Sequence, residues 1–382
     1  MNYPMKKIIL VILILTLLGL IIFLIKSDPS RHYTNDPNSA AKPVVKIGVI
    51  LPLTGNVSLF AESYRNGLIL AEKHLSPNTK FHYQLVVEDT GYNMKNVPMI
   101  ASRLLTLDKV DAGLSIFTPD AMILGPKFSE AKKIYVGSSS WFPEKFLKDK
   151  YNFHFYTDIK QEAEMIAAYI QDKEYKNVVM LTPNLEGTLG GSHLIKEALK
   201  EKNIPFCQEI IFNAGRRDFK MDLLKLQKNC RPQMYISLAL PPEADIILKQ
   251  IRETAGEKAD VTGLDLAQAF LSYKTAEGLT FPMMALPDEK WLSEYDNLFH
   301  DDLYFYLSAA AYDIFNVLVD AYENAPAENT IPTGDEISDY IHQKKHFDSS
   351  FGDKITVKPN GQVDLPAELL AVRNGKIEKA KN

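Results

Sequence analysis

The chain has 382 residues, of which 46% are apolar and 24% are charged, and its formal net charge is −5. This length is enough for two domains of ordinary size, each with its own hydrophobic core. The composition is that of a globular protein, and the slightly acidic balance argues against a nucleic-acid-binding protein.

The first feature along the chain is an unbroken apolar run, residues 8–25, preceded by Lys6 and Lys7. At about 1.5 Å of rise per residue, a helix of this run just reaches across a bilayer core. A cleaved signal peptide is the alternative, but its apolar region is usually shorter and is followed closely by small residues. Here Lys26 and a polar stretch follow the apolar run, and this stretch has no Cys that could carry a lipid anchor. We therefore expect residues 1–26 to form an uncleaved N-terminal transmembrane helix, with an exported body behind it.

Residues 27–43 are polar and rich in Pro, Ser and Asn, which is typical of a linker. Beyond the linker, short β-branched segments alternate with longer segments whose apolar residues recur every three or four positions, as in a helix. This βαβα succession predicts parallel sheets covered by helices on both faces. Because the pattern restarts at residue 177, we expect two similar α/β lobes. The expected strands are 46–51, 83–89, 112–117, 133–138, 177–183, 206–212, 234–240 and 259–265.

The loop PLTG, residues 52–55, separates the first strand from a helical pattern that includes Phe60 and Tyr64. In a parallel sheet, the loops at the carboxyl ends of the strands form ligand sites, and helix N-termini there offer unpaired N–H groups. The sequence therefore predicts a binding surface at this end of the first lobe.

A set of landmarks in order along the chain carries a resemblance to a known family. They are IGVILPLTG with RNGLILAEKHL, SIFTPDAMILGP, VGSSSWFPE, GRRDFKMDLLKLQ, LPPEADIILKQIRE, TGLDLAQAF, TAEGL and AAAYDIFNVLVDAYE. Together they resemble type I periplasmic solute-binding proteins, and most closely the leucine/isoleucine/valine-binding family of ABC importers. Each motif alone is weak, but their order and spacing are specific, and the resemblance covers roughly residues 44–378.

The resemblance implies an α/β fold of two Rossmann-like lobes with parallel sheets, called a Venus flytrap, which closes on a small molecule. Three crossings between the lobes are implied near Thr157, Leu286 and Phe351. The N-terminal lobe then comprises residues 44–157 and 287–350. The C-terminal lobe comprises residues 158–286 and 351–382.

The resemblance also implies ligand-binding residues in the first lobe. Phe60 matches an aromatic residue that packs against the ligand side chain, although an aromatic at helical spacing can simply be core. Thr118 falls where the family binds the ligand carboxylate with a hydroxyl and a backbone amide, or else caps the next helix. Ser138, Ser139 and Ser140 match a wall that supplies backbone groups to the ligand, while three hydroxyls in a loop are also ordinary turn chemistry.

Other positions depart from the family pattern. Trp141 stands where the amino-acid binders carry a Thr, so its ring either reshapes the cleft or packs away from it. Asp265 aligns with an acidic residue that pairs with the ligand ammonium, or else caps a helix. Gly187, and Leu240 or Pro241, occupy two aromatic positions of the family. These changes argue against a standard branched-chain amino acid as the ligand.

The two cysteines fall on a predicted strand and the helix that returns from it. Cys207 begins the strand FCQEIIF, and Cys230 ends the helix of residues 218–229. The start of a strand lies near the end of its returning helix, so an oxidising compartment would permit a disulfide between them. The sequence alone leaves the bond and the free thiols both open.

No catalytic arrangement is evident in the sequence. GSSSW lacks the glycine spacing of a nucleophile elbow, and EGTLGGSH lacks the Lys of a phosphate-binding loop. His342 and His346 have i,i+4 spacing, but without an evident third ligand they indicate a solvated helix end rather than a metal site. We therefore expect no enzyme, no cofactor and no metal.

The sequence predicts an extracytoplasmic solute-binding protein in the bacterial periplasm or at the cell exterior, tethered to the cytoplasmic membrane by its N-terminal helix. Its expected partners are a small amino-acid-like ligand and an ABC permease that receives it, with no nucleic acid. The alternative is a membrane-tethered sensor or regulatory binding protein of the same fold that acts on an envelope partner.

Overall fold

The computed structural model describes residues 42–55, 57–139, 142, 145–257, 259–264, 274–300, 305–352 and 354–380. It separates residues 1–42 from a second unit, residues 43–382, to which all the elements below belong. The predicted anchor, residues 8–25, lies outside the described residues, as do Ser140, Trp141 and Asp265. Within the described ranges, no helix is both long enough and apolar enough to span a bilayer.

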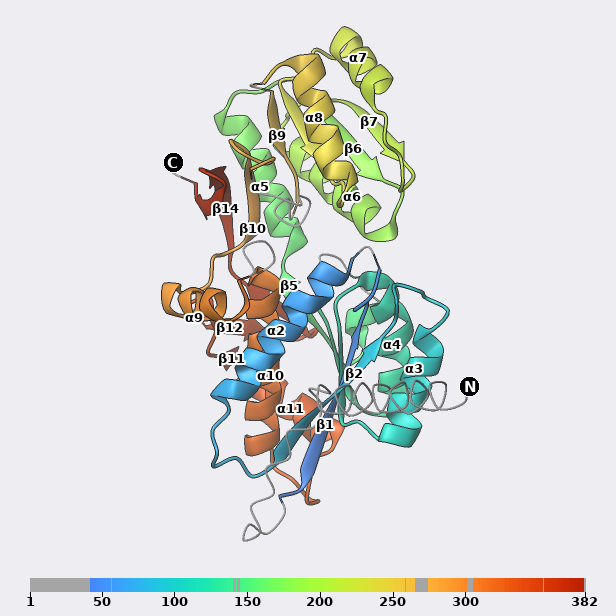
Figure 1. The fold of residues 1–382 in the computed structure, drawn as a ribbon, viewed down its shortest axis with the longest axis vertical. Helices are drawn as coiled ribbons and strands as arrows, with labels where there is room; N and C mark the ends of the chain where they lie inside the picture. The colour runs from blue at the N-terminus through green and yellow to red at the C-terminus, as the bar shows by residue number, and fades with distance from the viewer. Residues whose placement is uncertain are drawn as a thin grey trace, which may run out of the picture. The chain divides into compact units, whose positions relative to one another are not determined.

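An eight-stranded sheet forms the centre of the first lobe (Figure 1). Its order is β11-β12-β13-β5-β4-β3-β1-β2, and the six strands from β13 to β2 are parallel. The short strands β11 and β12 add an antiparallel edge. The strands are β1 (Val44–Leu51), β2 (His82–Asp89), β3 (Ala112–Ser115), β4 (Ile134–Gly137), β5 (Asn152–Thr157), β11 (His346–Phe347), β12 (Ile355–Val357) and β13 (Gln362–Leu365).

Helices cover both faces of this sheet, as its apolar strands predict. On one face lie α2 (Ser58–His74), α10 (Phe305–Asn324) and α11 (Gly334–Lys344), and on the other lie α3 (Val97–Arg103), its π-helical continuation Leu104–Asp108, and α4 (Thr118–Glu130). Alternate residues of β1 divide between the two cores, since Val49 packs with the α2 side and Ile50 with the α4 side.

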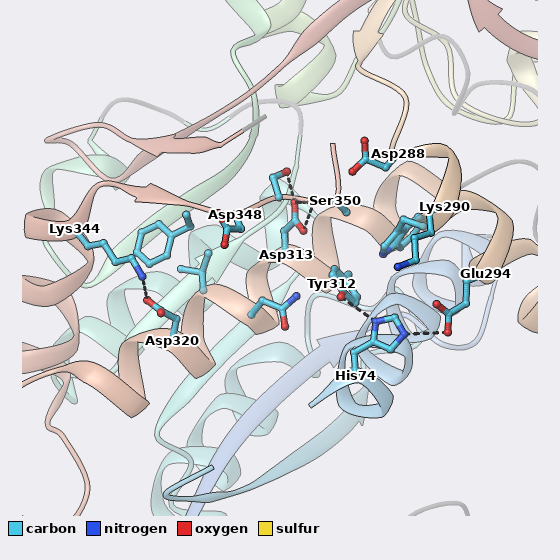
Figure 2. Close-up of a pocket in the computed structure, with 15 residues that line it drawn as sticks. His74, Asp288, Lys290, Glu294, Tyr312, Asp313, Asp320, Lys344, Asp348 and Ser350 are labelled. Atoms are coloured by element: carbon cyan, nitrogen blue, oxygen red, sulfur yellow. Dashed lines mark hydrogen bonds and ion pairs between the residues drawn. The ribbon is translucent and has the colours of Figure 1, made fainter. Parts of the chain in front are cut away.

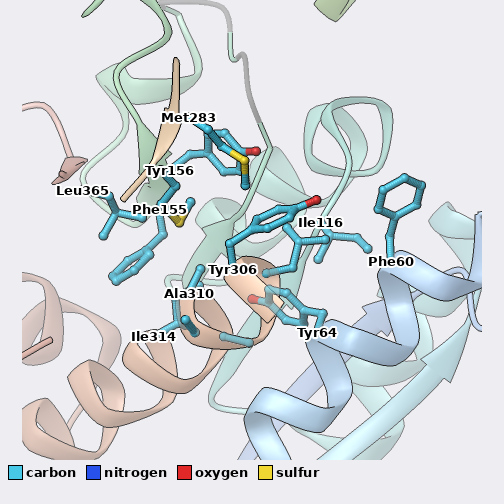
Figure 3. Close-up of a cluster of buried hydrophobic side chains, with 14 of the residues drawn as sticks. Phe60, Tyr64, Ile116, Phe155, Tyr156, Met283, Tyr306, Ala310, Ile314 and Leu365 are labelled. Atoms are coloured by element: carbon cyan, nitrogen blue, oxygen red, sulfur yellow. The ribbon is translucent and has the colours of Figure 1, made fainter. Parts of the chain in front are cut away.

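A close crossing of α2 and α10 fixes the helix that follows the first loop. A Cβ built on Gly67 would lie 2.0 Å from the carbonyl oxygen of Ser308, so only glycine fits at this contact. The Ser308 hydroxyl donates a hydrogen bond to the carbonyl of Ser63 at 2.6 Å. Tyr64 and Tyr306 are fully buried on these two helices, and Phe60 lies at the edge of the same cluster (Figure 3).

The second lobe is built on a four-stranded parallel sheet in the order β7-β6-β8-β9. Its strands are β6 (Val178–Pro183), β7 (Phe206–Phe212), β8 (Met234–Ser237) and β9 (Asp260–Thr262). Met180 packs with α5 (Ile159–Asp172) and α6 (Glu186–Glu201), while Leu181 faces the core of α7 (Lys220–Asn229) and α8 (Glu243–Ala255). The expected α/β architecture with parallel sheets is therefore present in both lobes.

A third, antiparallel sheet was not predicted. It contains β10 (Thr280–Met284), which precedes α9 (Glu289–Phe299), together with β14 (Ala367–Arg373) and β15 (Lys376–Lys379). The chain leaves the first sheet for the last time after Leu365, not near Phe351 as expected. The reason is that β13 pairs with β5, burying Val363 and Leu365 in the first lobe.

A disulfide joins Cys207, on β7, to Cys230, which directly follows α7. The two Cα atoms are 6.0 Å apart, and 23 residues separate the cysteines in sequence. The bond ties one edge of the second sheet to the end of the helix that returns from it.

Candidate functional site

A cavity of about 160 Å³ lies where the carboxyl ends of strands from both sheets meet. Loops that follow β2, β3, β4, β6 and β8 reach it, together with residues of α2, β5 and α10. Parallel sheets place their ligand sites at this end. The first-lobe lining is Phe60, Tyr92, Ile116, Phe117, Thr118, Pro119, Ser138, Ser139, Tyr156 and Leu307, and the second-lobe lining is Leu185, Glu186, Gly187, Thr188 and Leu240.

One wall of the cavity is aromatic. Phe60 is 5% exposed and packs edge-to-face against Phe117, with ring centroids 6.1 Å apart. Tyr92 meets the same Phe117 ring at 5.5 Å. Phe60 belongs to the core under α2 and also lines the cavity.

A second wall carries hydroxyl groups. The Thr118 and Ser139 hydroxyls are hydrogen-bonded to each other at 2.8 Å, and the Ser138 hydroxyl lies 3.4 Å from that of Tyr64. Thr118 is the first residue of α4 and not its N-cap, which is Phe117 and has no side-chain cap. The predicted positions Thr118, Ser138 and Ser139 therefore all line the cavity from the first lobe.

His154, which sequence reasoning missed, holds the Ser139 backbone in place. This buried side chain on β5 bonds the Ser139 carbonyl through Nε2 and Gln362 Oε1 through Nδ1, the latter at 2.6 Å. Burial lowers the pKa of the His154 imidazole. The Ser139 carbonyl and an amide oxygen can both only accept, so a neutral imidazole donates to one of them; when Nε2 donates to Ser139, Nδ1 is the acceptor and pairs with the NH2 group of the Gln362 amide. A single histidine within a buried strand gives no sequence signal of such a role.

The second lobe presents a wall of mixed polarity, which includes Glu186 and Thr188 beside Gly187 and two leucines. A Cβ built on Gly187 would lie 3.9 Å from the Thr118 hydroxyl oxygen, so the two lobes approach closely at this point. Leu185 and Glu186 begin the same helix, α6, and Leu240 precedes a cis peptide between Pro241 and Pro242. Gly187 and Leu240, the two positions expected to have lost aromatic rings, both line the cavity.

Tyr92, Tyr156, Glu186 and Leu307 line the cavity but were not predicted. Tyr92 could have been found, because it follows the end of β2 as the predicted loops follow their strands. Leu307 comes from α10, which lies some 190 residues beyond Phe117 in sequence, and nothing local marks it.

A larger hollow of about 600 Å³ lies on the first lobe, between the end of α2 and helices α9 and α10 (Figure 2). We do not assign the solute site to it, because its polar side chains bond one another. His74 contacts Glu294 and the Tyr312 hydroxyl, each at 3.0 Å. The buried Asp313 carboxylate accepts hydrogen bonds from the Ser349 hydroxyl at 2.6 Å and the Ser350 amide at 2.8 Å.

The two histidines of HQKKH do not share a helix. Helix α11 ends at Lys344, with His342 inside it and His346 in strand β11. His342 donates from Nδ1 to the Ser338 carbonyl at 2.8 Å, and His346 Nδ1 lies 3.1 Å from the Thr356 hydroxyl. In the part of the chain that the structure describes, no group of three or more His, Cys, Asp or Glu side chains is placed to hold a metal ion.

Comparisons with known proteins concern the family and the fold of the chain. Residues 44–376 match the family described as "Periplasmic binding protein". A leucine binding protein, LivK, from Thermotoga maritima is structurally similar with a TM-score of 0.77 and 22% identity, over 88% of this chain and 98% of that one. LivJ from Streptococcus pneumoniae is similar with a TM-score of 0.76 and 20% identity, over 88% of this chain and 99% of that one. It is a branched-chain amino acid transporter substrate binding protein solved in complex with isoleucine.

A third similar structure is a solute binding protein of an ABC transporter from Rhodopseudomonas palustris, solved with 3,4-dihydroxybenzoic acid. It gives a TM-score of 0.76 and 18% identity, over 89% of this chain and 96% of that one. Comparison with curated protein sequences gave no match. At these identities the similar structures establish the fold.

Proposed function

Because the chain belongs to the periplasmic binding protein family, we propose that it captures a small amino-acid-like solute between its lobes and delivers it to an ABC importer. The chain is a binding protein and not an enzyme, and its family implies a periplasmic location. The solute class and the delivery step are the proposed parts.

The observation that carries the proposal is the shared cavity. It is lined from both lobes, and Thr118 and Gly187 approach each other across it. At about 160 Å³ it is smaller than the sites of drug-sized ligands, and so it suits a solute of few heavy atoms. A solute that contacts both walls stabilises the closed arrangement over any more open one.

The lining suggests how such a solute is held. The ring of Phe60 offers an apolar contact, and the hydroxyls of Thr118, Ser138 and Ser139 offer hydrogen bonds. We retain Ser140, Trp141 and Asp265 as proposed contacts on the strength of the sequence resemblance alone. Closure of the two lobes around the solute then depends on polar groups of the first lobe and on the N-terminus of α6 in the second lobe.

A thermal-shift screen followed by calorimetry tests this proposal. Amino acids, neutral amides and aromatic acids are suitable probes, because similar structures hold isoleucine and 4-hydroxybenzoate. A solute at 100 times its Kd stabilises the folded protein by about 2.7 kcal/mol. Thr118→Val should weaken binding of any hit, whereas Thr106→Val, on an exposed helical turn, should not. Hits that bind Thr118→Val as tightly as wild type would place the site elsewhere.

We also propose that residues 8–25 remain in the mature protein and tether it to the cytoplasmic membrane, since the run is long enough to span and lacks a nearby cleavage signature. N-terminal sequencing of membrane-fraction protein tests this. A mature chain that begins near Lys42 would contradict it. Co-purification with a permease after mild crosslinking would support delivery, while capture of a different envelope protein would favour the sensor alternative.

A further inference from the structure

His154 is a buried histidine that connects two parts of the cavity lining. It is 4% exposed and lies on β5, two residues before Tyr156. Its Nε2 atom faces the carbonyl oxygen of Ser139, and its Nδ1 atom faces the side-chain oxygen of Gln362. The Gln362 amide nitrogen in turn donates to the carbonyl of Tyr156 at 3.4 Å and to that of Val363 at 3.3 Å. Because Ser139 and Tyr156 both line the cavity, this hydrogen-bond network reaches the solute site at two places.

The network contains more acceptors than a neutral histidine can satisfy. A neutral imidazole carries one N–H, whereas an imidazolium carries two. If Nε2 donates to Ser139, the Gln362 amide turns its NH2 group toward Nδ1, and the amide oxygen then faces the carbonyls of Tyr156 and Val363. If Nδ1 donates to Gln362 instead, the lone pair of Nε2 faces the Ser139 carbonyl. Only the protonated ring donates to both partners and leaves the Gln362 NH2 group for the two carbonyls.

The protonation of His154 therefore decides how firmly the cavity wall is held. A buried acceptor that faces another acceptor is unfavourable, because water cannot replace the missing donor. With a neutral ring, either the Ser139 carbonyl or the carbonyl of Tyr156 meets such an acceptor. The effect reaches the polar side of the cavity, since the hydroxyls of Ser139 and Thr118 are hydrogen-bonded to each other at 2.8 Å.

We propose that His154 is a positioning residue of the solute site, and that its protonated form fixes Ser139 and Tyr156 in the arrangement that binds solute. Solute capture then takes up a proton from the solvent. This inference rests on the proposed solute-binding function and adds to it a residue that acts through the backbone, together with a dependence on pH. Proton binding and solute binding each strengthen the other by the same factor.

The proposal fixes the sign of the pH dependence. Burial lowers the pKa of His154 below its ordinary value of 6.5, although hydrogen bonds to Ser139 and Gln362 and the charge of Asp158 oppose the shift. The free protein therefore holds the ring mostly neutral at pH 7, and bound solute should raise the pKa. Uptake of one proton changes affinity by at most about tenfold per pH unit. We expect solute to bind at least about threefold more tightly at pH 5 than at pH 7.5.

Other titratable groups lie on the elements around His154. In the described part of the chain they are Asp158 directly after β5, Tyr156 on β5, Tyr135 on β4, Asp120 on α4, and Lys358 after β12, which pairs with Asp158. Burial raises the pKa of Asp120 to about 7, so this acid ionises over a similar pH range. All of these groups remain when His154 alone is replaced. The difference between the pH profiles of wild type and such a variant therefore isolates His154.

Calorimetry on the full chain from pH 5 to 8 tests the inference, in pairs of buffers with different ionisation enthalpies that reveal proton uptake. The probes are isoleucine and 4-hydroxybenzoate, which similar structures hold. Wild type should bind more tightly in acid and take up as much as one proton per solute. His154→Gln should remove this uptake and flatten the pH profile. His346→Gln, the same change at an exposed histidine on β11, should leave the profile as in wild type.

A second variant should move the profile in the opposite direction. Gln362→Glu places a carboxylate against Nδ1, and an opposite charge at hydrogen-bond distance favours the imidazolium. Tight binding should then extend to higher pH. Nitrogen NMR of the chain labelled with 15N-histidine follows the His154 ring itself, which is identified as the signal that Gln362→Glu shifts. The pKa of this ring should be higher with bound solute than without it.

The outcomes separate this inference from the proposed function. If a probe binds with a pH profile that His154→Gln leaves unchanged, solute capture stands and the proton-linked role of His154 is wrong. That role is equally wrong if the His154 ring titrates at the same pH with and without solute. A purely structural role would weaken binding in His154→Gln at every pH by the same factor. If neither probe binds to wild type at any pH, both proposals fail. The NMR titration and Gln362→Glu keep the test decisive even if His154→Gln does not fold.

Discussion

Replacing Asp313 with Asn should change how the stability of the protein depends on pH. Asp313 lies on α10 in the hollow of Figure 2 and is 1% exposed. Burial raises the pKa of its carboxyl from 3.8 to about 7, although hydrogen bonds from Ser349 and Ser350 oppose the shift. A rise of about 3 pKa units corresponds to a free-energy cost on the order of 4 kcal/mol for holding the ionised group in the folded protein.

The sign of the pH effect on stability depends on how many protons the folded and unfolded states bind. Below pH 4 the carboxyl is protonated in both states, so it contributes no pH dependence there. Between about pH 4 and pH 7 the unfolded chain loses this proton while the folded chain keeps it, so rising pH favours unfolding by about 1.4 kcal/mol per unit. Above pH 7 both states are ionised and the effect levels off. Asn cannot ionise, so Asp313→Asn escapes this loss and gains relative stability across that window.

Denaturant unfolding at intervals from pH 4 to 8 measures the effect as the difference in free energy of unfolding between Asp313→Asn and wild type. Other groups titrate equally in both proteins and cancel from the difference. Asp348→Asn removes an exposed charge from the same hollow and serves as the control, since its side chain is 99% exposed. A difference that stays constant from pH 4 to 8 would refute the claim that burial governs Asp313.

Three further predictions concern packing and covalent structure. Gly67→Ala places a methyl group against the Ser308 carbonyl and should destabilise the protein by at least about 1–3 kcal/mol, measured as a lower denaturation midpoint. An unchanged midpoint would mean that α2 and α10 can move apart without cost. Replacing Cys207 and Cys230 with Ser opens a loop of 23 residues and should lower the free energy of unfolding by about 3 kcal/mol, measured by denaturation with and without reductant. Free thiols in the oxidised wild-type protein would contradict the presence of the disulfide. Gly187→Ala, whose Cβ makes only ordinary contacts, should preserve solute binding in calorimetry, whereas Gly187→Tyr should block it by filling the cavity; equal binding by both would remove Gly187 from the site.

Sequence patterns predicted the elements that depend on local periodicity. The strands β1 to β4 and β6 to β9 carry apolar residues at the spacing that a strand needs, and they were predicted in order, whereas β5 (Asn152–Thr157) was missed. The antiparallel sheet of β10, β14 and β15, and the return of β13 to the first lobe, were missed. These strands are short and partly polar, and β13 pairs with β5 across about 200 residues, so no local signal reveals the partner.

The residues of the candidate site also fall into those that the sequence predicts and those that it does not. Thr118, Ser138 and Ser139 follow strand ends, so the rule for parallel sheets together with the family resemblance reached them. Leu307 was missed because it comes from α10, far along the chain from the strand ends that reach the cavity. Its place in the cavity lining can be seen only in three dimensions.

The residues that hold the cavity wall in place come from parts of the chain that the sequence keeps far apart. Gln362 and His154 bond to each other, and His154 bonds the Ser139 carbonyl, so β13 and β5 together fix the loop that follows β4. Gln362 lies only three residues before Leu365, where the chain last leaves the first sheet. The segment that was assigned to the wrong lobe from sequence is therefore the one that supports the hydroxyl wall. The ends of the strands alone predict residues that line the cavity, but the hydrogen bonds that hold the loop after β4 in place depend on the long-range pairing of β13 with β5.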